Sequence, residues 1–228
     1  MSAGPTALRA GEHRRMRWKN GLGWTNEVAR EPADEAAPFV WRVSVAEVDA
    51  DCEFSEFAGV DRSILVLSGA GMQLRVGAAE ATLVAGGPAL AFAGEAGGVC
   101  RLLAGPTRDF NVMTRRGVCT HSLTRARVDG RLARAGGVGT TLVYVVAGRV
   151  TVAGLSVADG DCLRFEAGPG DRSDEAGPGD RSGEAGSGDR SDEAGPGDRS
   201  GEAGPGDRLV LVGAAELVVV RLGGGGDG

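Results

Sequence analysis

The sequence has few of the residues that hold metals or contact nucleic acids. It contains two histidines, His13 and His121, and one lysine against 24 arginines. A divalent ion needs several imidazole, thiolate or carboxylate ligands that converge on it, but no His-x-His or Cys-x-x-Cys pair is present. The arginines are scattered, without a basic stripe that carries interleaved aromatics. We therefore expect a protein without a metal or other cofactor and without a nucleic-acid partner.

Cysteine patterning and long apolar runs are also missing. Cys52, Cys100, Cys119 and Cys162 are spread along the chain, which favours free thiols over a redox pair or a zinc knuckle. No apolar run approaches the ~20 residues of a membrane helix, and residues 1–17 lack the apolar stretch of a signal peptide. We expect a cytoplasmic protein that has no membrane partner.

Alternation of apolar and polar residues dominates from Phe39 onward. Trp41, Val43 and Val45 alternate with the polar or small residues between them, a pattern typical of a β-strand. No segment of useful length has a helical period, so we predict an all-β protein with glycine-rich turns. Further strands are predicted at residues 64–67, 72–76, 81–84, 89–92, 99–103 and 110–113.

The second half of the chain repeats features of the first. Val66-Leu-Ser-Gly69 is matched by Val145-Val-Ala-Gly148, and Gly87–Phe92 by Gly160–Phe165. Such short similarities arise easily in chains rich in glycine and valine, so alone they leave duplication open. A duplication would give two antiparallel barrels, in which closing each sheet removes its exposed edges.

Five stretches in order resemble the HutD/Ves family. They are Trp18-Lys-Asn-Gly-Leu-Gly-Trp-Thr-Asn-Glu27, Phe39-Val-Trp-Arg-Val-Ser-Val-Ala46, Phe54-Ser-Glu-Phe57, Gly59-Val-Asp-Arg62 and Asp109-Phe-Asn-Val-Met-Thr-Arg-Arg116. The resemblance implies a bicupin, a protein of two tandem cupin-type barrels, associated with bacterial histidine breakdown. Leu22 and Ala58 depart from the family pattern, and both departures affect loop shape more than side-chain chemistry.

The resemblance also suggests how the chain is divided. We expect a frayed amino terminus at 1–15, a first barrel at 16–118, a second barrel at 119–222 and a glycine-rich tail at 223–228. Residues 166–208 interrupt the second barrel with five copies of a nonapeptide close to Glu-Ala-Gly-Pro-Gly-Asp-Arg-Ser-(Asp or Gly), the last one truncated. These copies hold 12 acids and 5 arginines, and the rest of the chain has a net charge of +1.

The nonapeptide repeat has a composition that predicts a solvated, mobile loop between two strands. A calcium-binding β-roll would need an aliphatic residue in each turn, and the repeat supplies only alanine. Because closing a longer loop costs little entropy, we expect deletion of the repeat to leave folding and ligand binding intact.

Polar side chains supply the candidate site. Alternation puts Arg42 and Ser44 on one face of their strand. If that face lines the barrel, the guanidinium offers two parallel donors to a carboxylate and Ser44 adds a hydroxyl. The alternative is that Arg42 faces solvent, or pairs with a structural acid such as Asp61, while Trp41 packs in the core.

The remaining candidates lie in the stretches that resemble the family. Asn20, Thr25 and Glu27 could bond to an amide or imidazole, or could belong to a capped turn anchored by two tryptophans. Asp61 and Arg62 could contact a ligand or form an ion pair that braces a loop, and Asp109 and Asn111 share one strand face. The candidate ligand-binding residues are Asn20, Thr25, Glu27, Arg42, Ser44, Asp61, Arg62, Asp109 and Asn111.

Three hypotheses of function follow. The first is a bicupin that binds a small carboxylate, which the resemblance implies is urocanate or a formylated glutamate derivative, and so moderates histidine utilisation. The second is a metal-independent isomerase or hydrolase with Glu27 or Asp109 as general base. The third is an interaction scaffold that contacts partners through the repeat. The sequence leaves the oligomeric state open, a homodimer included.

Overall fold

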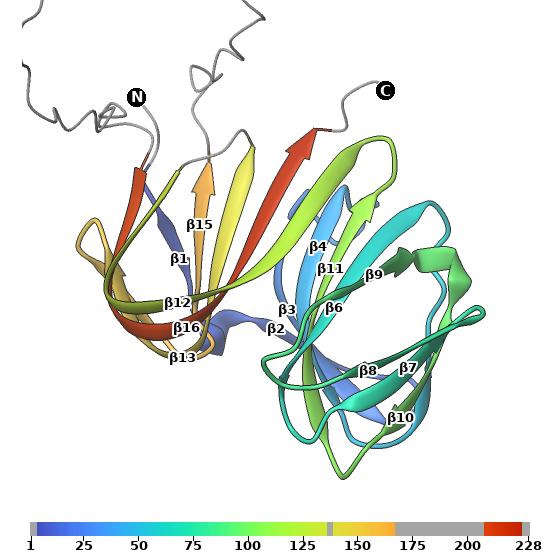
Figure 1. Ribbon diagram of the computed structural model, residues 1–228. Helices are drawn as coiled ribbons and strands as arrows, with labels where there is room; N and C mark the ends of the chain where they lie inside the picture. The colour runs from blue at the N-terminus through green and yellow to red at the C-terminus, as the bar shows by residue number, and fades with distance from the viewer. Residues whose placement is uncertain (1–3, 136–138, 167–207, 225–228) are drawn as a thin grey trace, which may run out of the picture.

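The computed structural model describes residues 4–135, 139–166 and 208–224. These residues form strands joined by turns and two short 3-10 segments, η1 (Ala10–Glu12) and η2 (Gly94–Ala96), with no α-helix among them (Figure 1). The expected all-β class is therefore confirmed. The strands are β1 (Thr6–Leu8), β2 (Arg14–Arg17), β3 (Gly23–Glu31), β4 (Trp41–Val48), β5 (Cys52–Phe54), β6 (Val60–Ser68), β7 (Met72–Val76), β8 (Ala79–Leu83), β9 (Leu90–Ala93), β10 (Gly98–Leu102), β11 (Thr107–Arg115), β12 (Cys119–Ala135), β13 (Thr140–Val152), β14 (Leu155–Ala158), β15 (Cys162–Glu166) and β16 (Arg208–Gly224).

The first barrel is built from two sheets. One has the strand order β2-β3-β4-β11-β6-β9, and the other has the order β5-β10-β7-β8. Aliphatic residues of both sheets, such as Val48, Ile64 and Leu74, pack together between them. The polar cavity described below shares this interior.

The second barrel is a single curved sheet of the order β1-β15-β13-β16-β12, with β14 paired to β13 (Figure 1). Its path β15-β13-β16-β12 repeats the path β9-β6-β11-β4 of the first barrel. In the second barrel the 17-residue β16 runs without a break, and it covers the positions that β10 and β11 occupy separately in the first. The strand order therefore supports the duplication that the sequence left open.

The strands on either side of the repeat lie where the sequence placed them. β15 ends at Glu166 and β16 begins at Arg208, so the insertion joins two consecutive strands of the second barrel. Residues 167–207 lie outside the described residues. The predictions of a mobile loop and of tolerance to its deletion therefore stay predictions.

Both ends of the chain are more ordered than the sequence predicted. β1 pairs with the edge strand β15 of the second barrel, and Arg9 Nη1 donates to Asp161 Oδ2 over 3.0 Å. β2 pairs with β3, so the prediction of a frayed terminus is wrong for residues 6–15, where sheet edges supply hydrogen-bond partners. Gly223 and Gly224 extend β16 against β12, which shortens the expected tail to residues 225–228, outside the described residues.

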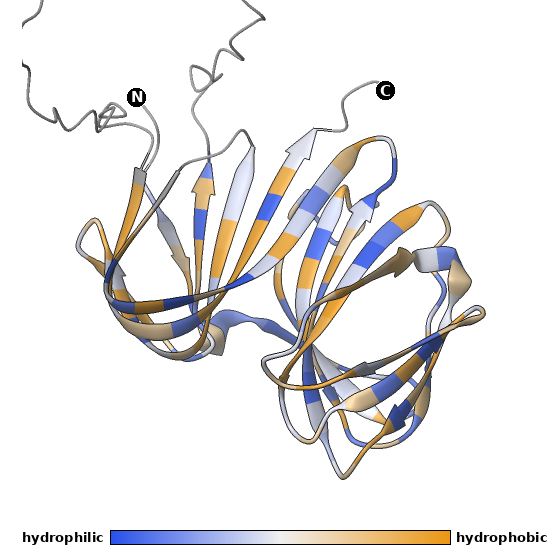
Figure 2. Ribbon diagram, viewed as in Figure 1, coloured by the Kyte–Doolittle hydropathy of each residue, from blue (hydrophilic) through white to orange (hydrophobic). Residues whose placement is uncertain are grey.

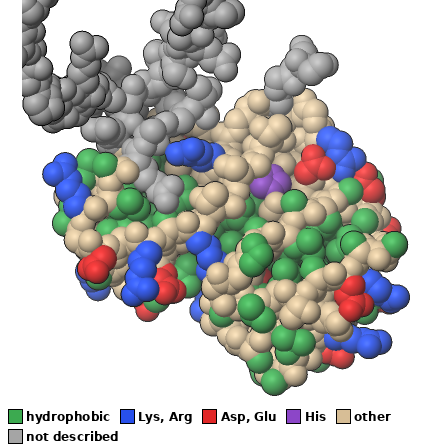
Figure 3. All heavy atoms as spheres, in the orientation of Figure 1, with side chains coloured by type: hydrophobic (Ala, Val, Ile, Leu, Met, Phe, Trp, Pro, Cys, Tyr) green, Lys and Arg blue, Asp and Glu red, His purple; other side chains and the backbone are tan. Residues whose placement is uncertain are grey.

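A second apolar core joins the two barrels. Trp41, Val43 and Val45 of β4 pack in one cluster with Leu142, Val218 and other residues of the second sheet. Figure 2 shows the apolar and polar residues alternating along these strands, and Figure 3 shows hydrophobic side chains at the junction of the two barrels. Because one face of β4 is used between the barrels, its opposite face must line the first barrel.

Two glycines occupy equivalent bends in the two barrels. Gly69 follows β6 and Gly148 lies in β13, and both have φ of +96°. A Cβ atom would lie 2.5 Å from the Pro106 carbonyl oxygen at the first position and 2.2 Å from the Ala214 carbonyl oxygen at the second. Only glycine allows this close approach of two backbones.

Gly148→Ala is expected to lower the free energy of unfolding by about 2 kcal/mol more than Gly154→Ala. Both positions have positive φ, which costs an alanine about 1–2 kcal/mol, but an added Cβ atom at Gly154 meets nothing within 4 Å. Chemical denaturation measures the free energy of unfolding of both variants, and the difference between them reports the backbone clash at Gly148. Equal decreases in the two variants would contradict this account of the bend.

Candidate functional site

A polar cavity of about 500 Å³ lies inside the first barrel. It is bounded by β2, β3, β4, β6 and β11, by the β2–β3 connection, and by β5 with the loop after it. Its volume lies within the range of small-molecule sites. The lining residues are Met16, Arg17, Trp18, Lys19, Asn20, Thr25, Arg42, Ser44, Ala46, Glu53, Phe54, Ser55, Phe57, Arg62, Asp109, Asn111 and Met113.

Strand pairing brings distant candidate residues together. Met113 of β11 pairs with Arg42 on β4 and with Arg62 on β6, so the two arginines flank it across the sheet. One step along β11 on the same face, Asn111 pairs with Ser44. Side chains as distant in the sequence as those of Arg42 and Met113 therefore converge on one cavity, because antiparallel register aligns them on one face.

Arg42 and Glu27 form a partly buried ion pair at the cavity wall. Arg42 Nε donates to Glu27 Oε2 over 2.5 Å, and the Glu27 side chain is 8% exposed. The predicted pairing of Arg42 with a structural acid is thus found, but the acid is Glu27 instead of Asp61. Arg42 lines the cavity while Glu27 supports it from the adjacent strand.

Arg62 lies deeper and is surrounded by aromatic rings. It is 4% exposed, and its guanidinium carbon lies 5.0–5.5 Å from the ring centres of Phe54, Phe57 and Phe92. One nitrogen donates to the Ser55 carbonyl oxygen over 3.2 Å. Burial lowers the pKa of Arg62 to about 10, so the group is still a cation at neutral pH, and its charge is only weakly screened by water.

Asp109 and Asn111 present acceptors that lack protein partners. Asp109 is 1% exposed, and within the described residues both its carboxyl oxygens have no hydrogen-bond partner, as is also true of Asn111 Oδ1 and Arg62 Nε. Burial raises the pKa of Asp109 to about 7, and the Arg62 charge opposes this rise. Buried polar atoms without partners are costly, and these four atoms belong to residues that line one cavity.

The opening motif forms an anchored turn that also borders the cavity. Trp18 Nε1 donates to Thr25 Oγ1 over 2.8 Å, and Asn20 Oδ1 accepts from the Leu22 backbone N–H over 3.0 Å. Trp18 and Leu22 pack against the apolar interior of the first barrel. The two alternatives for this motif are therefore compatible, because Asn20 and Thr25 stabilise the turn and line the cavity as well.

Asp61 is placed away from this cavity. Its carboxylate is 48% exposed and accepts from Arg116 Nε over 2.8 Å, so neither a lining role nor the predicted pairing with Arg62 is found. Alternation along β6 turns it to the side opposite Arg62. Phe54 and Phe57 also line the cavity, and the stretch that contains them carried the family resemblance without indicating a role for either ring.

The histidines do not assemble a metal site. His121 bridges the barrels through Ser63 Oγ at 2.9 Å and Thr114 Oγ1 at 2.8 Å. His13 directly follows η1. In residues 4–135, 139–166 and 208–224, no three His, Cys, Asp or Glu side chains gather as metal ligands. The same residues include no helix long and apolar enough to cross a membrane.

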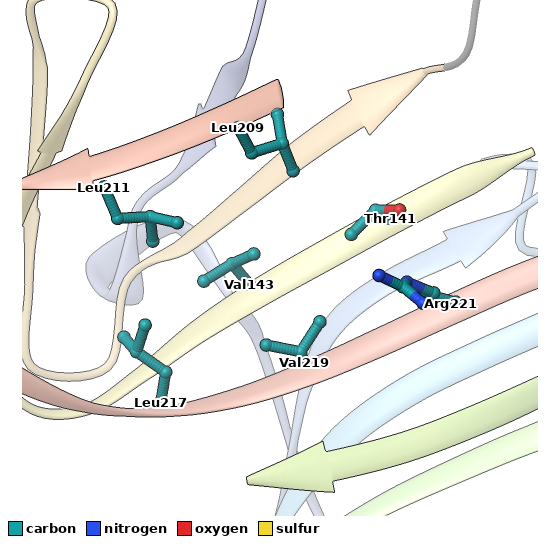
Figure 4. A pocket seen from close by; sticks show the side chains of 7 residues that line it. All are labelled: Thr141, Val143, Leu209, Leu211, Leu217, Val219 and Arg221. Carbon is teal, nitrogen blue, oxygen red and sulfur yellow. The ribbon is translucent and has the colours of Figure 1, made fainter. Parts of the chain in front are cut away.

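The depression described in the second barrel is far smaller than the polar cavity. It has a volume of about 10 Å³, roughly that of one water molecule. Figure 4 shows aliphatic side chains, among them Val143, Leu217 and Val219, around it, with Arg221 at one end. Among the described residues, the polar cavity of the first barrel is the stronger candidate site.

The family model described as HutD matches residues 10–179. The chain belongs to the HutD family. This HutD-family protein is 37% identical, over 70% of its length and 85% of the relative, to an uncharacterized 21.2 kDa protein in the hutC 3′ region of Pseudomonas putida. It is 35% identical to protein Ves of Citrobacter koseri over 58% of this chain and 67% of that protein. The HutD/Ves resemblance is therefore confirmed.

Solved structures agree with this assignment. HutD from Pseudomonas fluorescens SBW25 in a formate condition has a TM-score of 0.71 and 29% identity, covering 98% of this chain and 100% of that one. The bacterial pirin YhhW of Escherichia coli has a TM-score of 0.57 and 11% identity, covering 95% and 98% of the two chains, and supports the fold alone. The HutD-family protein is thus a bicupin, as the resemblance implied.

Proposed function

We propose that the first barrel binds a small organic acid that also carries an N–H group, and that this binding moderates histidine utilisation. The observation that carries the proposal is the combination of the buried Arg62 and the partly buried Arg42 with acceptors of Asp109 and Asn111 that have no partner among the described residues, all around one cavity. A ligand of this class would satisfy both kinds of group.

The arginines favour a carboxylate. Guanidinium groups bind carboxylates through charge-assisted hydrogen bonds, and Arg62 Nε has no partner in the described part of the chain. The net charge near the cavity is positive, because the cations at its wall (Arg17, Lys19, Arg42 and Arg62) outnumber the acids Glu27, Glu53 and Asp109. That HutD of P. fluorescens was studied in a formate condition is consistent with an acid as the ligand.

Asp109 and Asn111 favour an N–H donor on the same ligand. A carboxylate accepts hydrogen bonds when ionised, and a ligand N–H would replace the water that burial has removed. Urocanate has an imidazole and a carboxylate, and N-formylglutamate has an amide N–H and two carboxylates. The genomic setting of the P. putida relative, in the hutC 3′ region, supports a link to the same pathway.

Calorimetry at pH 8 tests this ligand class. Urocanate or N-formylglutamate should bind the wild-type protein at least ten times more tightly than glutarate, which has two carboxylates and no N–H. The preference should shrink in Asp109→Asn, because the variant loses the charged acceptor. Equal affinities for glutarate and the N–H acids, or no binding of any of them, would contradict the proposal.

Asp109→Asn is also expected to stabilise the protein at high pH. The pKa of Asp109 is raised from its ordinary value of 3.8 to about 7 in the folded protein, so the folded state holds an extra proton between these values. The free energy of unfolding of the wild type therefore falls as pH rises from about 4 to 7. We expect the variant to gain about 2 kcal/mol over wild type at pH 8 and little at pH 4.

Chemical denaturation at pH 4 and pH 8 checks this sign. Asp49→Asn, at an exposed aspartate, is the matched control and should shift stability by less than about 0.5 kcal/mol at either pH. A variant that is less stable than wild type at pH 8 would show that Asp109 has a stabilising partner in the folded protein.

A metal-independent enzyme is the second candidate function. The pKa of Asp109 near 7 suits a general base at neutral pH, whereas Glu27 is occupied by its ion pair with Arg42. Of the two bases considered from the sequence, the geometry favours Asp109. Incubation of purified protein with the same acids distinguishes the functions, since a sensor returns its ligand unchanged and an enzyme loses turnover in Asp109→Asn.

A further inference from the structure

Two cysteines that are 48 positions apart in the sequence face each other in the first barrel. Cys52 of β5 is the direct cross-strand partner of Cys100 of β10 in the antiparallel register. Such pairs have Cα atoms about 4.5–5.5 Å apart, and disulfides span about 4.4–6.8 Å. The sequence, with its scattered cysteines, gave no sign of this pairing. Both thiols are free in the structure.

The two thiols differ in environment. Cys100 is fully buried and its Sγ lies 3.4 Å from Met72 Sδ, whereas Cys52 is 7% exposed. The contact with Cys100 lowers the pKa of Cys52, and the contact with Cys52 raises the pKa of Cys100. Cys52 is therefore the better nucleophile of the pair. Both residues line an open depression of about 430 Å³, and Cys52, the more exposed of the two, is the one that an oxidant would meet first.

We propose that Cys52 and Cys100 are a reversible redox pair that braces the wall of the ligand cavity. A low-molecular-weight disulfide such as oxidised glutathione is the oxidant. The Cys52 thiolate attacks one of its sulfurs and releases one glutathione thiolate. Cys100 then loses its proton and attacks the Cys52 sulfur of the mixed disulfide, which releases the second glutathione. The protein loses two hydrogen atoms, and one glutathione disulfide becomes two thiols.

The brace acts on residues that line the ligand cavity. Glu53 and Phe54 follow Cys52 in β5 and line the cavity, and the Phe54 ring lies against Arg62. Asn20 and Glu53 also border both the cavity and the depression beside the thiols. A disulfide between β5 and β10 restricts the movement of this wall. We therefore expect the ligand affinities of the oxidised and the reduced protein to differ at least threefold. This part of the inference rests on the proposed function, but disulfide formation does not.

The experiment treats the native full-length protein with oxidised glutathione and then removes the reagent. The intact mass should fall by about 2 Da, free thiols counted after denaturation should fall from four to two, and a non-reducing peptide map should join the peptides of Cys52 and Cys100. Dithiothreitol should restore the mass and the thiol count. The oxidised form should melt roughly 5–10 °C higher, since the bond closes a loop of about 50 residues.

Matched variants assign the bond. Cys52→Ala and Cys100→Ala should each abolish the two-thiol loss, whereas Cys119→Ala and Cys162→Ala should keep it. The peptide map of the wild type needs no variant, so it decides the question even if Cys100→Ala fails to fold. A disulfide between any other two cysteines, or four free thiols after treatment with oxidised glutathione, would contradict the proposal that Cys52 and Cys100 are a redox pair. A Cys52–Cys100 bond with unchanged affinity for a ligand that binds the reduced form overturns the brace.

Discussion

Arg62→Met is expected to weaken binding of the acid ligand about 100-fold. Removing one partner of a buried charged hydrogen bond costs about 2–5 kcal/mol, and 1.4 kcal/mol corresponds to a factor of ten. Methionine keeps the apolar contacts with the three phenylalanine rings. The buried charge of Arg62 is costly, but at pH 8 it also favours the ionised form of Asp109, whose pKa it lowers. At pH 5, where Asp109 is protonated, removal of Arg62 should therefore leave the free energy of unfolding unchanged or higher. Calorimetry at pH 8 measures the affinity, and denaturation at pH 5 measures the stability.

Arg116→Met is the matched control for this variant. Arg116 forms its ion pairs with Asp61 and Glu95 on the exposed side of the first barrel, so its loss should leave ligand affinity within twofold. Arg42→Ala is a less specific test, because it would leave the buried carboxylate of Glu27 without its partner and destabilise the fold. Unchanged affinity in Arg62→Met would remove Arg62 from the binding site.

Phe110→Ala is expected to lower the free energy of unfolding by about 4 kcal/mol, the typical cost of a large-to-small change at a buried phenylalanine. Phe110 is fully buried in the core between the barrels. Its ring centre lies 5.1 Å from that of Tyr144 in the second barrel, so the variant loses packing across the junction. The melting temperature should fall by roughly 10 °C in thermal denaturation.

Val118→Ala provides the comparison for Phe110→Ala. Val118 is 48% exposed in the turn between β11 and β12, and its truncation should change stability by less than about 0.5 kcal/mol. If Phe110→Ala melts within 2 °C of wild type, the junction between the barrels does not support the stability of the whole chain. Two separate melting transitions in the variant would show that the barrels had become independent.

Local patterning predicted most of the strands, because the period-two alternation reports which side chains share a face. It placed Trp41, Val43 and Val45 on one side of β4 and Arg42 on the other. It did not reveal which side faced the cavity, since both faces of β4 are largely buried. The second sheet covers the apolar face through contacts between residues more than 90 positions apart, and this contact directs Arg42 inward.

The candidate site was predicted in part. Seven of the nine candidate residues line the cavity; of the other two, Glu27 supports Arg42 and Asp61 lies outside. Once Arg62 is known to face the cavity, alternation along the strand places Asp61 outside it. The sequence alone does not show which of these two neighbouring residues faces the cavity. The aromatic surroundings of Arg62 depend on Phe54 and Phe57 from one stretch and on Phe92, which the pairing of β9 with β6 places opposite Arg62.

The sequence by itself determined the all-β class, the strand-forming segments, the family and the polar residues available for a site. These features depend on local periodicity and short motifs, which act over a few residues. The tertiary structure decided which face became the cavity, paired Arg42 with Glu27, buried Asp109 away from any hydrogen-bond partner in the described part of the chain, and brought Cys52 opposite Cys100. Each of these outcomes depends on the register between strands distant in the sequence, and register is fixed only when both barrels close and pack against each other.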